Sequence, residues 1–364
     1  MKALGKKNVL MFTRTMGLGG TENVVLQLCQ ILKPQVNNIV VCSCGGVNVK
    51  KLTEIGIKHY EIPDIERKKI KVILDTLKIL YKIIHIEKIS IVHTHHRMAA
   101  FYTCLLKNIK KFTFFCTAHN TFEDKRLLTR FSYHRAKVIA CGVMVKKNLT
   151  DFYGIPEKNV TVIHNAVAMY DGEKKDDETL MSLKKNGMVL VGNVGRLSKQ
   201  KGMEYFIESY SKVKDKYRDV KYIIVGDGED ADKLKELARK QGIENDIVFM
   251  GYRSDIQNVI RQLDFVVLSS LWEGLPLTPI EAFSVHKTVI GTEVDGTVEI
   301  IKDGKNGFLI PAKDSDAIAE KVCVLLGNPE LRKRLEEEAY RTYVDKFCFE
   351  RFAEKVLSFY ELAS

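Results

Sequence analysis

Short apolar runs rich in β-branched residues alternate with longer amphipathic stretches along most of the chain. The first run is Val9–Phe12, and the helix-like stretch Glu22–Leu32 follows it. Strands that alternate with helices form βαβ units, which build a parallel sheet covered by helices on both faces. The chain is therefore predicted to belong to the α/β class, and its ligands should bind at the carboxyl ends of the strands.

The alternation stops once, over a polar and charged stretch that includes Asp171–Glu178, and it restarts at Met188–Val194. A chain of 364 residues is long enough for two Rossmann-like domains. We predict an N-terminal domain over 1–167, a linker over 168–187, a C-terminal domain over 188–345 and a final helix over 346–364 that packs back on the N-terminal domain. The two domains should face each other across a ligand-binding cleft.

Composition indicates a globular protein that stays in the cytoplasm. Hydrophobic residues make up 45% and charged residues 28% of the chain. No apolar run reaches the roughly 18–20 residues that span a bilayer, and the apolar run after the basic N-terminus is too short for a signal peptide. None of the eight cysteines forms a CxxC pair, which is typical of reduced core thiols. The net charge of +11 favours polyanionic partners without choosing among them.

Three glycine-containing turns follow predicted strands. The first, Gly17–Glu22, contains Gly19 and Gly20 but lacks the third glycine of a dinucleotide fingerprint; the open alternative is a tight turn with Thr21 as N-cap. The second, Gly195–Gly202, carries Arg196 and Lys201, which could hold a diphosphate or form a solvated basic loop. The third is a turn at Gly226.

The segment Leu271–Ala282 is the most informative. Glu273 and Glu281 enclose a loop with glycine and proline, and Thr278-Pro279-Ile280-Glu281 has the pattern of a capping box with Thr278 as N-cap. Two carboxylates would then flank unpaired helical N–H groups, an arrangement that can bind hydroxyls and phosphate. The alternatives are that Glu281 only caps the helix and that Glu273 is an exposed loop acid.

Histidines follow two strands of the first half. His93 and His95 come after Ile89–Val92, and His119 comes after Phe112–Cys116. An H-x-H pair can bind metal, as in metal-dependent hydrolases, but no eight-unit barrel is present. Helix capping and core hydrogen bonding are the alternatives for His93 and His96.

Taken together, these motifs resemble the family 4 retaining glycosyltransferases, which have the GT-B fold. The resemblance covers nearly the whole chain and includes the E-x(7)-E pair Glu273/Glu281. It implies that the N-terminal domain binds the acceptor and the C-terminal domain binds a nucleoside-diphosphate sugar. Departures from the family pattern occur at Thr21, His164 and Ala166, where Ala, Pro and Gly are more usual.

The resemblance also implies roles for individual residues. Arg196 and Lys201 would neutralise the leaving diphosphate without a metal or any other cofactor, Glu273 would contact the donor sugar, and His119 would lie beside that sugar. Glu281 would bind the ribose and Tyr252 would contact the base, and a UDP-sugar is favoured over a GDP-sugar. The remaining donor-binding residues are Gly19, Gly20, Asn165, Gly226, Leu275, Leu277 and Thr278.

The expected reaction is hexosyl transfer with retention of configuration to a saccharide acceptor, in particular a lipid-linked one used for cell-surface polysaccharide. The stretch Lys68–Ile86 has an apolar stripe at Ile70, Ile73, Leu77, Leu80 and Ile84 with lysines off it. It is either a packed helix with a solvated face or a contact with the anionic inner face of the plasma membrane. The competing functions are a nucleotide-sugar 2-epimerase and a hydrolase with metal on His93/His95. Nucleic-acid binding has no basic stripe with interleaved aromatics to support it.

Overall fold

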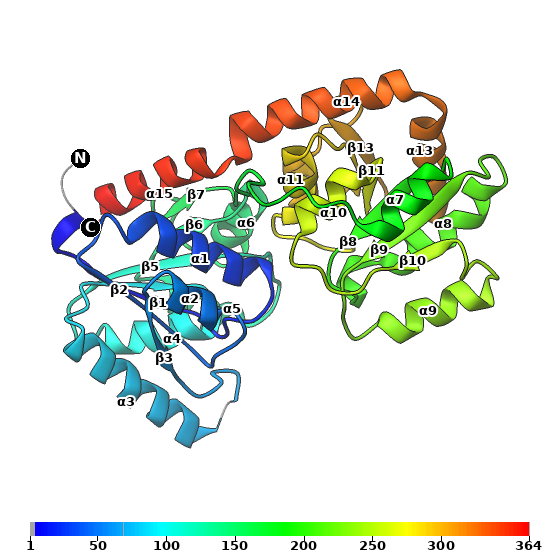
Figure 1. Ribbon diagram of the computed structural model, residues 1–364. Helices are drawn as coiled ribbons and strands as arrows, with labels where there is room; N and C mark the ends of the chain where they lie inside the picture. The colour runs from blue at the N-terminus through cyan, green and yellow to red at the C-terminus, as the bar shows by residue number, and fades with distance from the viewer. Residues whose placement is uncertain (1–3, 68, 364) are drawn as a thin grey trace. The chain divides into compact units, whose positions relative to one another are not determined.

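The computed structural model describes residues 4–67 and 69–363, and the chain divides into two compact units. Unit 1 comprises Met1–Asn165 and Phe352–Ser364, and unit 2 comprises Ala166–Arg351. The chain therefore passes from one unit to the other twice, and its C-terminal segment belongs to the same unit as its N-terminal segment. Figure 1 shows each unit as a parallel sheet with helices around it.

Unit 1 is built on a parallel seven-stranded sheet with the order β3-β2-β1-β4-β5-β6-β7. Its strands are β1 Asn8–Phe12, β2 Asn38–Ser43, β3 Lys58–Glu61, β4 Ile91–Thr94, β5 Thr113–Ala118, β6 Lys137–Ala140 and β7 Val160–Val162. Its helices are α1 Gly20–Leu32, α2 Val49–Glu54, α3 Ile70–Ile86, α4 Arg97–Leu106, α5 Arg126–Tyr133, α6 Val143–Lys147 and most of α15 Phe349–Ala363; short 3₁₀ or π turns lie at Leu4–Lys6, Asn148–Phe152 and Glu157–Asn159.

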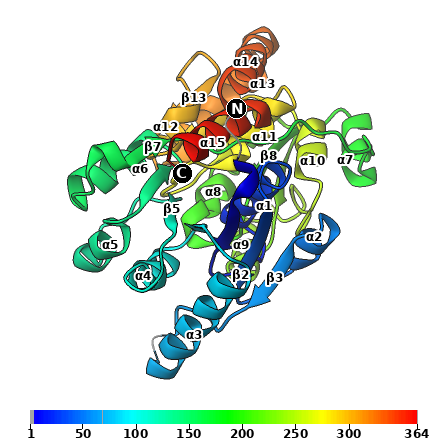
Figure 2. The same ribbon diagram turned by 90° about the vertical axis from the view of Figure 1, so that its left-hand side faces the viewer.

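The central strands of unit 1 are buried on both faces, as a parallel sheet requires. In β1, residues Val9–Phe12 have no exposed surface. Figure 2 shows α1 and α15 on one side of this sheet and α3, α4 and α5 on the other. The helix α15 is held by aromatic packing, because the rings of Phe359 and Tyr360 lie 5.0 and 4.9 Å from the ring of Phe115 in β5.

Unit 2 repeats the same topology with six parallel strands in the order β10-β9-β8-β11-β12-β13. The strands are β8 Val189–Val194, β9 Val220–Val225, β10 Ile247–Phe249, β11 Phe265–Leu268, β12 Val289–Thr292 and β13 Gly307–Ile310. The helices are α7 Glu178–Lys185, α8 Met203–Lys214, α9 Ala231–Lys240, α10 Ile256–Gln262, α11 Leu277–Ser284, α12 Thr297–Ile300, α13 Ser315–Gly327 and α14 Pro329–Thr342, with a 3₁₀ turn at Lys199–Lys201 and a π turn at Tyr343–Phe347.

The core of unit 2 lies between the sheet and the helices α8, α9 and α13. Phe206 of α8 stacks on Tyr222 of β9 with ring centroids 4.0 Å apart, and Val322 of α13 is fully buried in the same cluster. This α/β core and the parallel order of both sheets confirm the predicted fold class.

The segment treated as a linker in the sequence contains a helix. Residues 168–177 form no helix or strand, as expected, but α7 begins at Glu178. The Asp177 side chain caps it by accepting hydrogen bonds from the amides of Thr179 and Leu180. The polar sequence hides this helix because only Leu180 of α7 is buried.

None of the helices within residues 4–67 and 69–363 is both long enough and apolar enough to cross a bilayer.

Candidate active site

The loops that follow β8, β9 and β10 in unit 2 are joined by their backbones. The amide of Gly195 donates to Val225 O at 2.9 Å, and the amide of Gly226 donates to Gly251 O at 2.8 Å. Gly226 has a φ of +139°, and a Cβ there would lie 1.9 Å from Gly195 O. Only glycine permits this approach, so the three loops form one continuous surface at the carboxyl ends of neighbouring strands.

An ion pair links the loop after β8 to the loop after β11. Lys201 Nζ is 2.5 Å from Glu273 Oε1, and the two side chains are only 16% and 7% exposed. The Ser270 hydroxyl donates to the same carboxylate oxygen at 2.7 Å. From the sequence, Lys201 was expected to bind the diphosphate and Glu273 was expected to contact the donor sugar, as separate groups. In the structure the two side chains form one ion pair. The reading of Glu273 as an exposed loop acid is wrong.

Backbone contacts hold both partners of this pair in place. The amide of Leu271 donates to Gln200 O at 2.7 Å, and the Ser269 hydroxyl donates to Lys201 O at 2.9 Å. A Cβ on Gly202, whose φ is +53°, would lie 2.4 Å from Ser269 O. The Lys201 turn and the Glu273 loop therefore pack backbone against backbone, which fixes the geometry of the ammonium and the carboxylate.

The capping box predicted for α11 is wrong. The helix begins at Leu277, with Pro276 at the N-cap and no side-chain capping bond. The Thr278 hydroxyl instead donates to Val194 O at 3.2 Å, because the end of β8 offers a buried carbonyl at that point. Thr278 thus ties α11 to β8, and Glu281 lies beyond the first turn.

Glu281 is the second carboxylate of the surface. Burial raises its pKa to about 7, against the opposing effect of the Lys201 charge. The carboxyl group therefore changes charge near neutral pH. A ligand that supplies hydroxyl donors would favour the ionised form.

Arg196 and Tyr252 lie on the exposed rim of the same surface. The Arg196 side chain is 72% exposed and pairs only loosely with Glu229, at 3.3 Å. Tyr252 is 53% exposed and follows Gly251, which has a φ of +67°. Leu275, by contrast, is buried at 5% exposure and supports the loop from beneath. The cation and the aromatic ring are thus available to a ligand.

The strand ends of unit 1 carry neutral histidines. His95 Nδ1 and His119 Nε2 lie 3.2 Å apart, and the rings of His93 and His95 stack at 4.5 Å. Burial lowers the pKa of His93 to about 3 and of His119 to about 4. Imidazoles in this cluster are therefore hydrogen-bonding groups at neutral pH, not cations.

The structure does not leave His93 available as a metal ligand. His93 uses both ring nitrogens within the core: Nδ1 is 2.6 Å from the Tyr360 hydroxyl, and Nε2 is 2.8 Å from the Thr117 hydroxyl. His96 accepts from the amide of Met98 and caps α4. Within residues 4–67 and 69–363, no cluster of three or more His, Cys, Asp or Glu side chains is placed to hold a metal ion.

A cavity of about 580 Å³ opens beside these histidines within unit 1. His95, Arg97, His119 and Tyr133 line it together with residues of α5 and the turn Asn148–Phe152. Thr21 also contributes to the lining, but it does not cap α1 as the sequence allowed, since Gly19 is the N-cap. Gly20 opens α1, and Asn165 is buried at the end of unit 1.

One group of this site was missed at the sequence level. Ser270, which hydrogen-bonds Glu273, carried no pattern of its own. A serine two residues before the Trp272-Glu273 pair was the only available signal.

Family models match both units. The model described as Glycosyltransferase Family 4 matches residues 18–169, and the model described as Glycosyl transferases group 1 matches residues 175–342. A UDP-Gal:alpha-D-GlcNAc-diphosphoundecaprenol alpha-1,3-galactosyltransferase of Escherichia coli is 30% identical over 326 residues, 82% of this chain and 83% of that protein. The chain belongs to glycosyltransferase family 4. It is a glycosyltransferase that uses a nucleotide-sugar donor.

Other relatives and solved structures are similar over nearly the full length. An uncharacterized glycosyltransferase of Methanocaldococcus jannaschii is 24% identical over 91% of this chain and 87% of that protein. The crystal structure of a glycosyltransferase from Rickettsia africae superposes with a TM-score of 0.85 at 25% identity, covering 98% of each chain. The structure of Anabaena Alr3699/HepE in complex with UDP-glucose gives a TM-score of 0.85 at 18% identity, with 97% and 99% coverage. The fold is accordingly GT-B.

Proposed function

We propose that this protein is a metal-independent, retaining hexosyltransferase. It moves a sugar from a UDP-sugar to a lipid-linked saccharide in the biosynthesis of a cell-surface polysaccharide, in the cytoplasm at the inner face of the plasma membrane. The observation that carries the proposal is the Lys201–Glu273 ion pair, 2.5 Å long and shielded from water at the strand ends of unit 2. Arg196 adds a second cation that a ligand can reach.

The proposed chemistry follows from the charges. Cleavage of a nucleotide sugar develops negative charge on the diphosphate, and Lys201 and Arg196 stabilise that charge most strongly in the transition state. Glu273 orients the ammonium of Lys201 and accepts hydrogen bonds from the donor sugar. The acceptor hydroxyl attacks from the face that the diphosphate leaves, and the departing phosphate takes its proton, so the anomeric configuration is retained.

The donor assignment draws on relatives as well as residues. The Escherichia coli relative is named for UDP-galactose, and Anabaena HepE was solved with UDP-glucose. In this chain Glu281 would accept hydrogen bonds from the ribose hydroxyls and Tyr252 would contact the uracil. Gly226 and Thr278 shape the backbone around the diphosphate, together with Leu275 and Leu277.

The acceptor would bind in the cavity of unit 1. Its volume of about 580 Å³ accommodates one or two sugar rings, and its polar lining offers Arg97 and Tyr133. His119 would contribute a neutral hydrogen bond to the donor sugar. The acceptor in the name of the Escherichia coli relative is a diphosphoundecaprenol-linked sugar, which supports a lipid-linked acceptor here.

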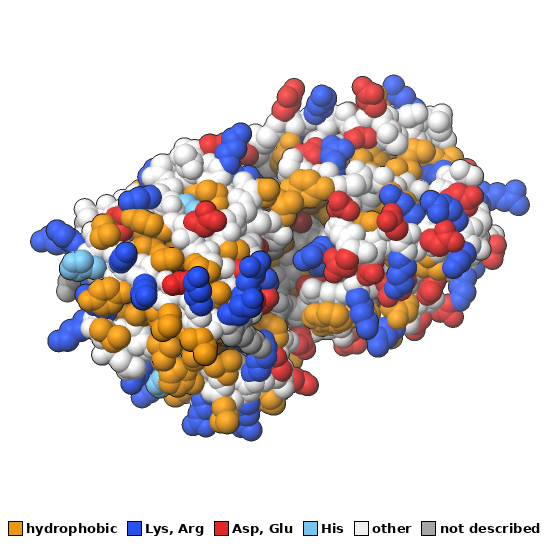
Figure 3. All heavy atoms as spheres, turned by 90° about the horizontal axis from the view of Figure 1, so that it is seen from below, with side chains coloured by type: hydrophobic (Ala, Val, Ile, Leu, Met, Phe, Trp, Pro, Cys, Tyr) orange, Lys and Arg blue, Asp and Glu red, His pale blue; other side chains and the backbone are white. Residues whose placement is uncertain are grey.

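Membrane association is supported by α3. The predicted inward stripe is only partly correct, since Leu80 and Ile84 are buried but Ile70 is 76% exposed. Figure 3 shows hydrophobic and basic side chains intermixed on a face of unit 1. Exposed apolar residues with neighbouring lysines suit the interface of an anionic bilayer. The exposed apolar residues of α3 and the following segment are Ile70, Leu74, Tyr81, Ile86 and Ile109, and the lysines are Lys71, Lys78, Lys82, Lys110 and Lys111.

Membrane association is tested by sedimentation with vesicles of phosphatidylglycerol and phosphatidylcholine. We expect binding at low salt that is lost at high salt and on vesicles of phosphatidylcholine alone. Leu74→Asp should reduce binding several-fold. The matched control is Leu362→Asp, because Leu362 is 84% exposed outside this face. Equal binding by the two variants would contradict the assignment of α3.

Activity is tested by measuring nucleotide release from UDP-sugars with candidate acceptors. We expect release that requires an acceptor and yields a product whose anomeric signal in NMR shows retention. Turnover of the donor without any acceptor would point to the 2-epimerase, and an inverted linkage would contradict the proposed mechanism.

A further inference from the structure

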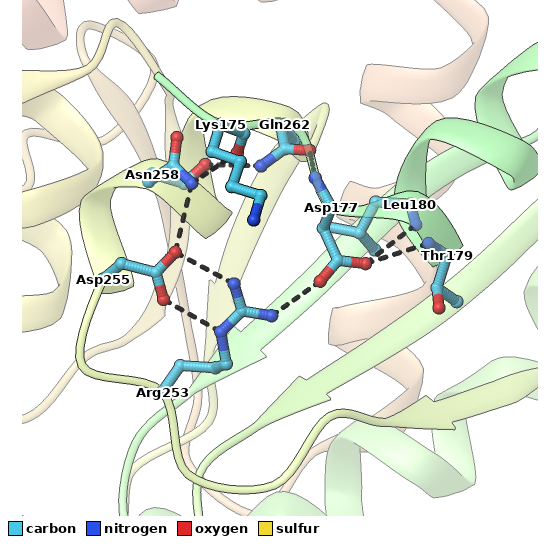
Figure 4. Close-up of polar contacts among 8 residues, drawn as sticks. All are labelled: Lys175, Asp177, Thr179, Leu180, Arg253, Asp255, Asn258 and Gln262. Atoms are coloured by element: carbon cyan, nitrogen blue, oxygen red, sulfur yellow. Dashed lines mark hydrogen bonds and ion pairs between the residues drawn. The ribbon is translucent and has the colours of Figure 1, made fainter. Parts of the chain in front are cut away.

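The segment immediately after Tyr252 is fastened by one guanidinium group. Arg253 directs Nε and Nη2 at the two carboxylate oxygens of Asp255, at 2.8 and 2.9 Å. Its third nitrogen, Nη1, lies 2.6 Å from Asp177 Oδ2, as Figure 4 shows. This use of the planar fork fixes both the place and the orientation of Arg253, and a lysine ammonium could not reproduce it.

The partner Asp177 is itself fixed. Its Oδ1 accepts from the amides of Thr179 and Leu180 at 3.0 and 3.3 Å, and its own amide donates to Gln262 Oε1 at 2.7 Å. Asp177 therefore offers Arg253 an anchor that does not depend on Arg253 for its own position.

Two further contacts join residues 175–177, the segment that contains Asp177, to α10. Asn258 Nδ2 donates to Lys175 O at 2.7 Å and to Asp255 Oδ2 at 3.1 Å. Arg261 Nη2 lies 2.8 Å from Asp176 Oδ1. Residues 175–177 are thus attached at three consecutive positions to α10 and the loop before it, but only the contact through Arg253 is next to Tyr252 in the chain.

Tyr252 lies between two fixed points. On one side, Gly251 O accepts from the amide of Gly226 at 2.8 Å, and Gly251 has the left-handed φ of +67° that turns the chain. On the other side, Arg253 is held by its contacts with the carboxylates of Asp255 and Asp177. The Tyr252 ring itself is 53% exposed, so its position depends on these neighbours and not on burial.

We propose that Arg253 is a positioning residue for nucleobase recognition. By coupling the loop after β10 to Asp177, it holds Tyr252 where the base of the donor binds, without touching the donor itself. The inference rests on the proposed function, in which Tyr252 contacts the base. Loss of Arg253 should therefore weaken recognition of the nucleoside and spare recognition of the diphosphate by Arg196 and Lys201.

The test compares two ligands on the full-length chain by titration calorimetry. We expect Arg253→Ala to weaken the binding of UDP by about 10-fold and the binding of inorganic pyrophosphate by less than about 2-fold. Arg253→Lys should have an intermediate effect. In steady-state assays the KM for the donor should rise in parallel, and kcat should stay within about 3-fold of the original value. Because Asp177 carries the effect, Asp177→Ala and Arg253→Ala should be strongly non-additive when combined.

Arg261→Ala is the matched control, since Arg261 of α10 forms an ion pair with Asp176, next to Asp177, without adjoining Tyr252. It should leave UDP affinity within about 2-fold of the wild-type value. Equal losses in Arg253→Ala and Arg261→Ala, or equal losses of UDP and pyrophosphate in Arg253→Ala, would overturn the proposal. The thermal midpoint of each variant is measured in parallel, and Arg253→Lys replaces Arg253→Ala if the alanine variant unfolds.

Failure of the inference and failure of the proposed function give different results. Wild-type protein that binds UDP, with Arg253 variants that bind it equally well, overturns only the role of Arg253. Wild-type protein that binds neither UDP nor any UDP-sugar overturns both.

Discussion

The two units share a strand order but differ in the chemistry at their strand ends. In unit 2 the loops after β8 and β11 bring a lysine and a glutamate into a shielded ion pair, with Glu281 and Arg196 on the same surface. In unit 1 the corresponding edge carries His93, whose nitrogens are satisfied by core hydroxyls, and the pair His95 and His119. The same topology thus supports a charged site in one unit and a neutral one in the other.

This difference follows from how each edge is stabilised. Unit 2 uses glycines to bring backbone against backbone, so side chains remain free to carry charge at the surface. Unit 1 inserts aromatic and imidazole rings from β4, β5 and α15, and burial keeps them neutral. A charged edge suits a nucleoside diphosphate, and a neutral edge suits the hydroxyl groups of a sugar.

The largest expected effect is at Lys201. Lys201→Ala should lower kcat by about 10²- to 10³-fold, because it removes a charge-stabilising donor and leaves Glu273 buried without its cation. The measurement is steady-state release of UDP. Lys199→Ala is the control, since Lys199 is exposed in the same turn. Comparable rates for the two variants would remove Lys201 from the chemistry.

Arg196→Ala should cost about 10²-fold in kcat, because in the proposed donor site the exposed Arg196 side chain would stabilise the leaving diphosphate. Its loss leaves no buried charge unpaired, so the thermal midpoint should not change. A variant with near-normal turnover would show that Lys201 alone stabilises the negative charge on the diphosphate.

Glu281 should make both stability and donor binding depend on pH. Its pKa of about 7 exceeds the 4.5 of an ordinary glutamate, so the folded chain holds a proton more tightly than the unfolded chain. The stabilisation is complete below pH 4.5 and is lost as the pH rises through about 7. Donor affinity should rise over the same upper range, because in the proposed donor site the ionised carboxylate would accept hydrogen bonds from the ribose. Thermal melts and UDP titrations of Glu281→Gln should lack both trends; a variant that keeps them excludes Glu281 as the titrating group.

The smallest effect is expected at the neutral edge. His119→Ala should lower kcat/KM by about 10-fold, as for one lost hydrogen bond. The loss should be constant between pH 6 and 8, because burial lowers the pKa of His119 to about 4. Histidine NMR signals followed with pH provide the measurement. An imidazole of His119 that titrates between pH 6 and 7 would contradict the neutral character of this edge.

The fold could be predicted from local patterns because buried parallel strands and their helices carry their own periodicity. Strand β3 was not predicted, because Lys58–Glu61 has no apolar run. Helix α7 was not predicted, because it buries only one residue. The site was predicted as a set of residues but not as a set of contacts. Lys201 and Glu273 are 72 positions apart, and His93 and Tyr360 are 267 positions apart, so only the folded sheet shows that they pair. The prediction of a capping box at α11 was wrong for the same reason, since the Val194 carbonyl that accepts from the Thr278 hydroxyl belongs to β8.

Donor use by unit 2 is tested most directly by titrating the wild-type protein and Lys201→Ala with UDP-sugars and GDP-sugars in the presence of a chelator. We predict that the wild-type protein binds a UDP-sugar more tightly than any GDP-sugar without a divalent metal, and that Lys201→Ala weakens this binding by at least about 10-fold. Binding that requires a divalent metal, or binding that is unchanged by Lys201→Ala, would contradict a donor site built on the Lys201–Glu273 pair.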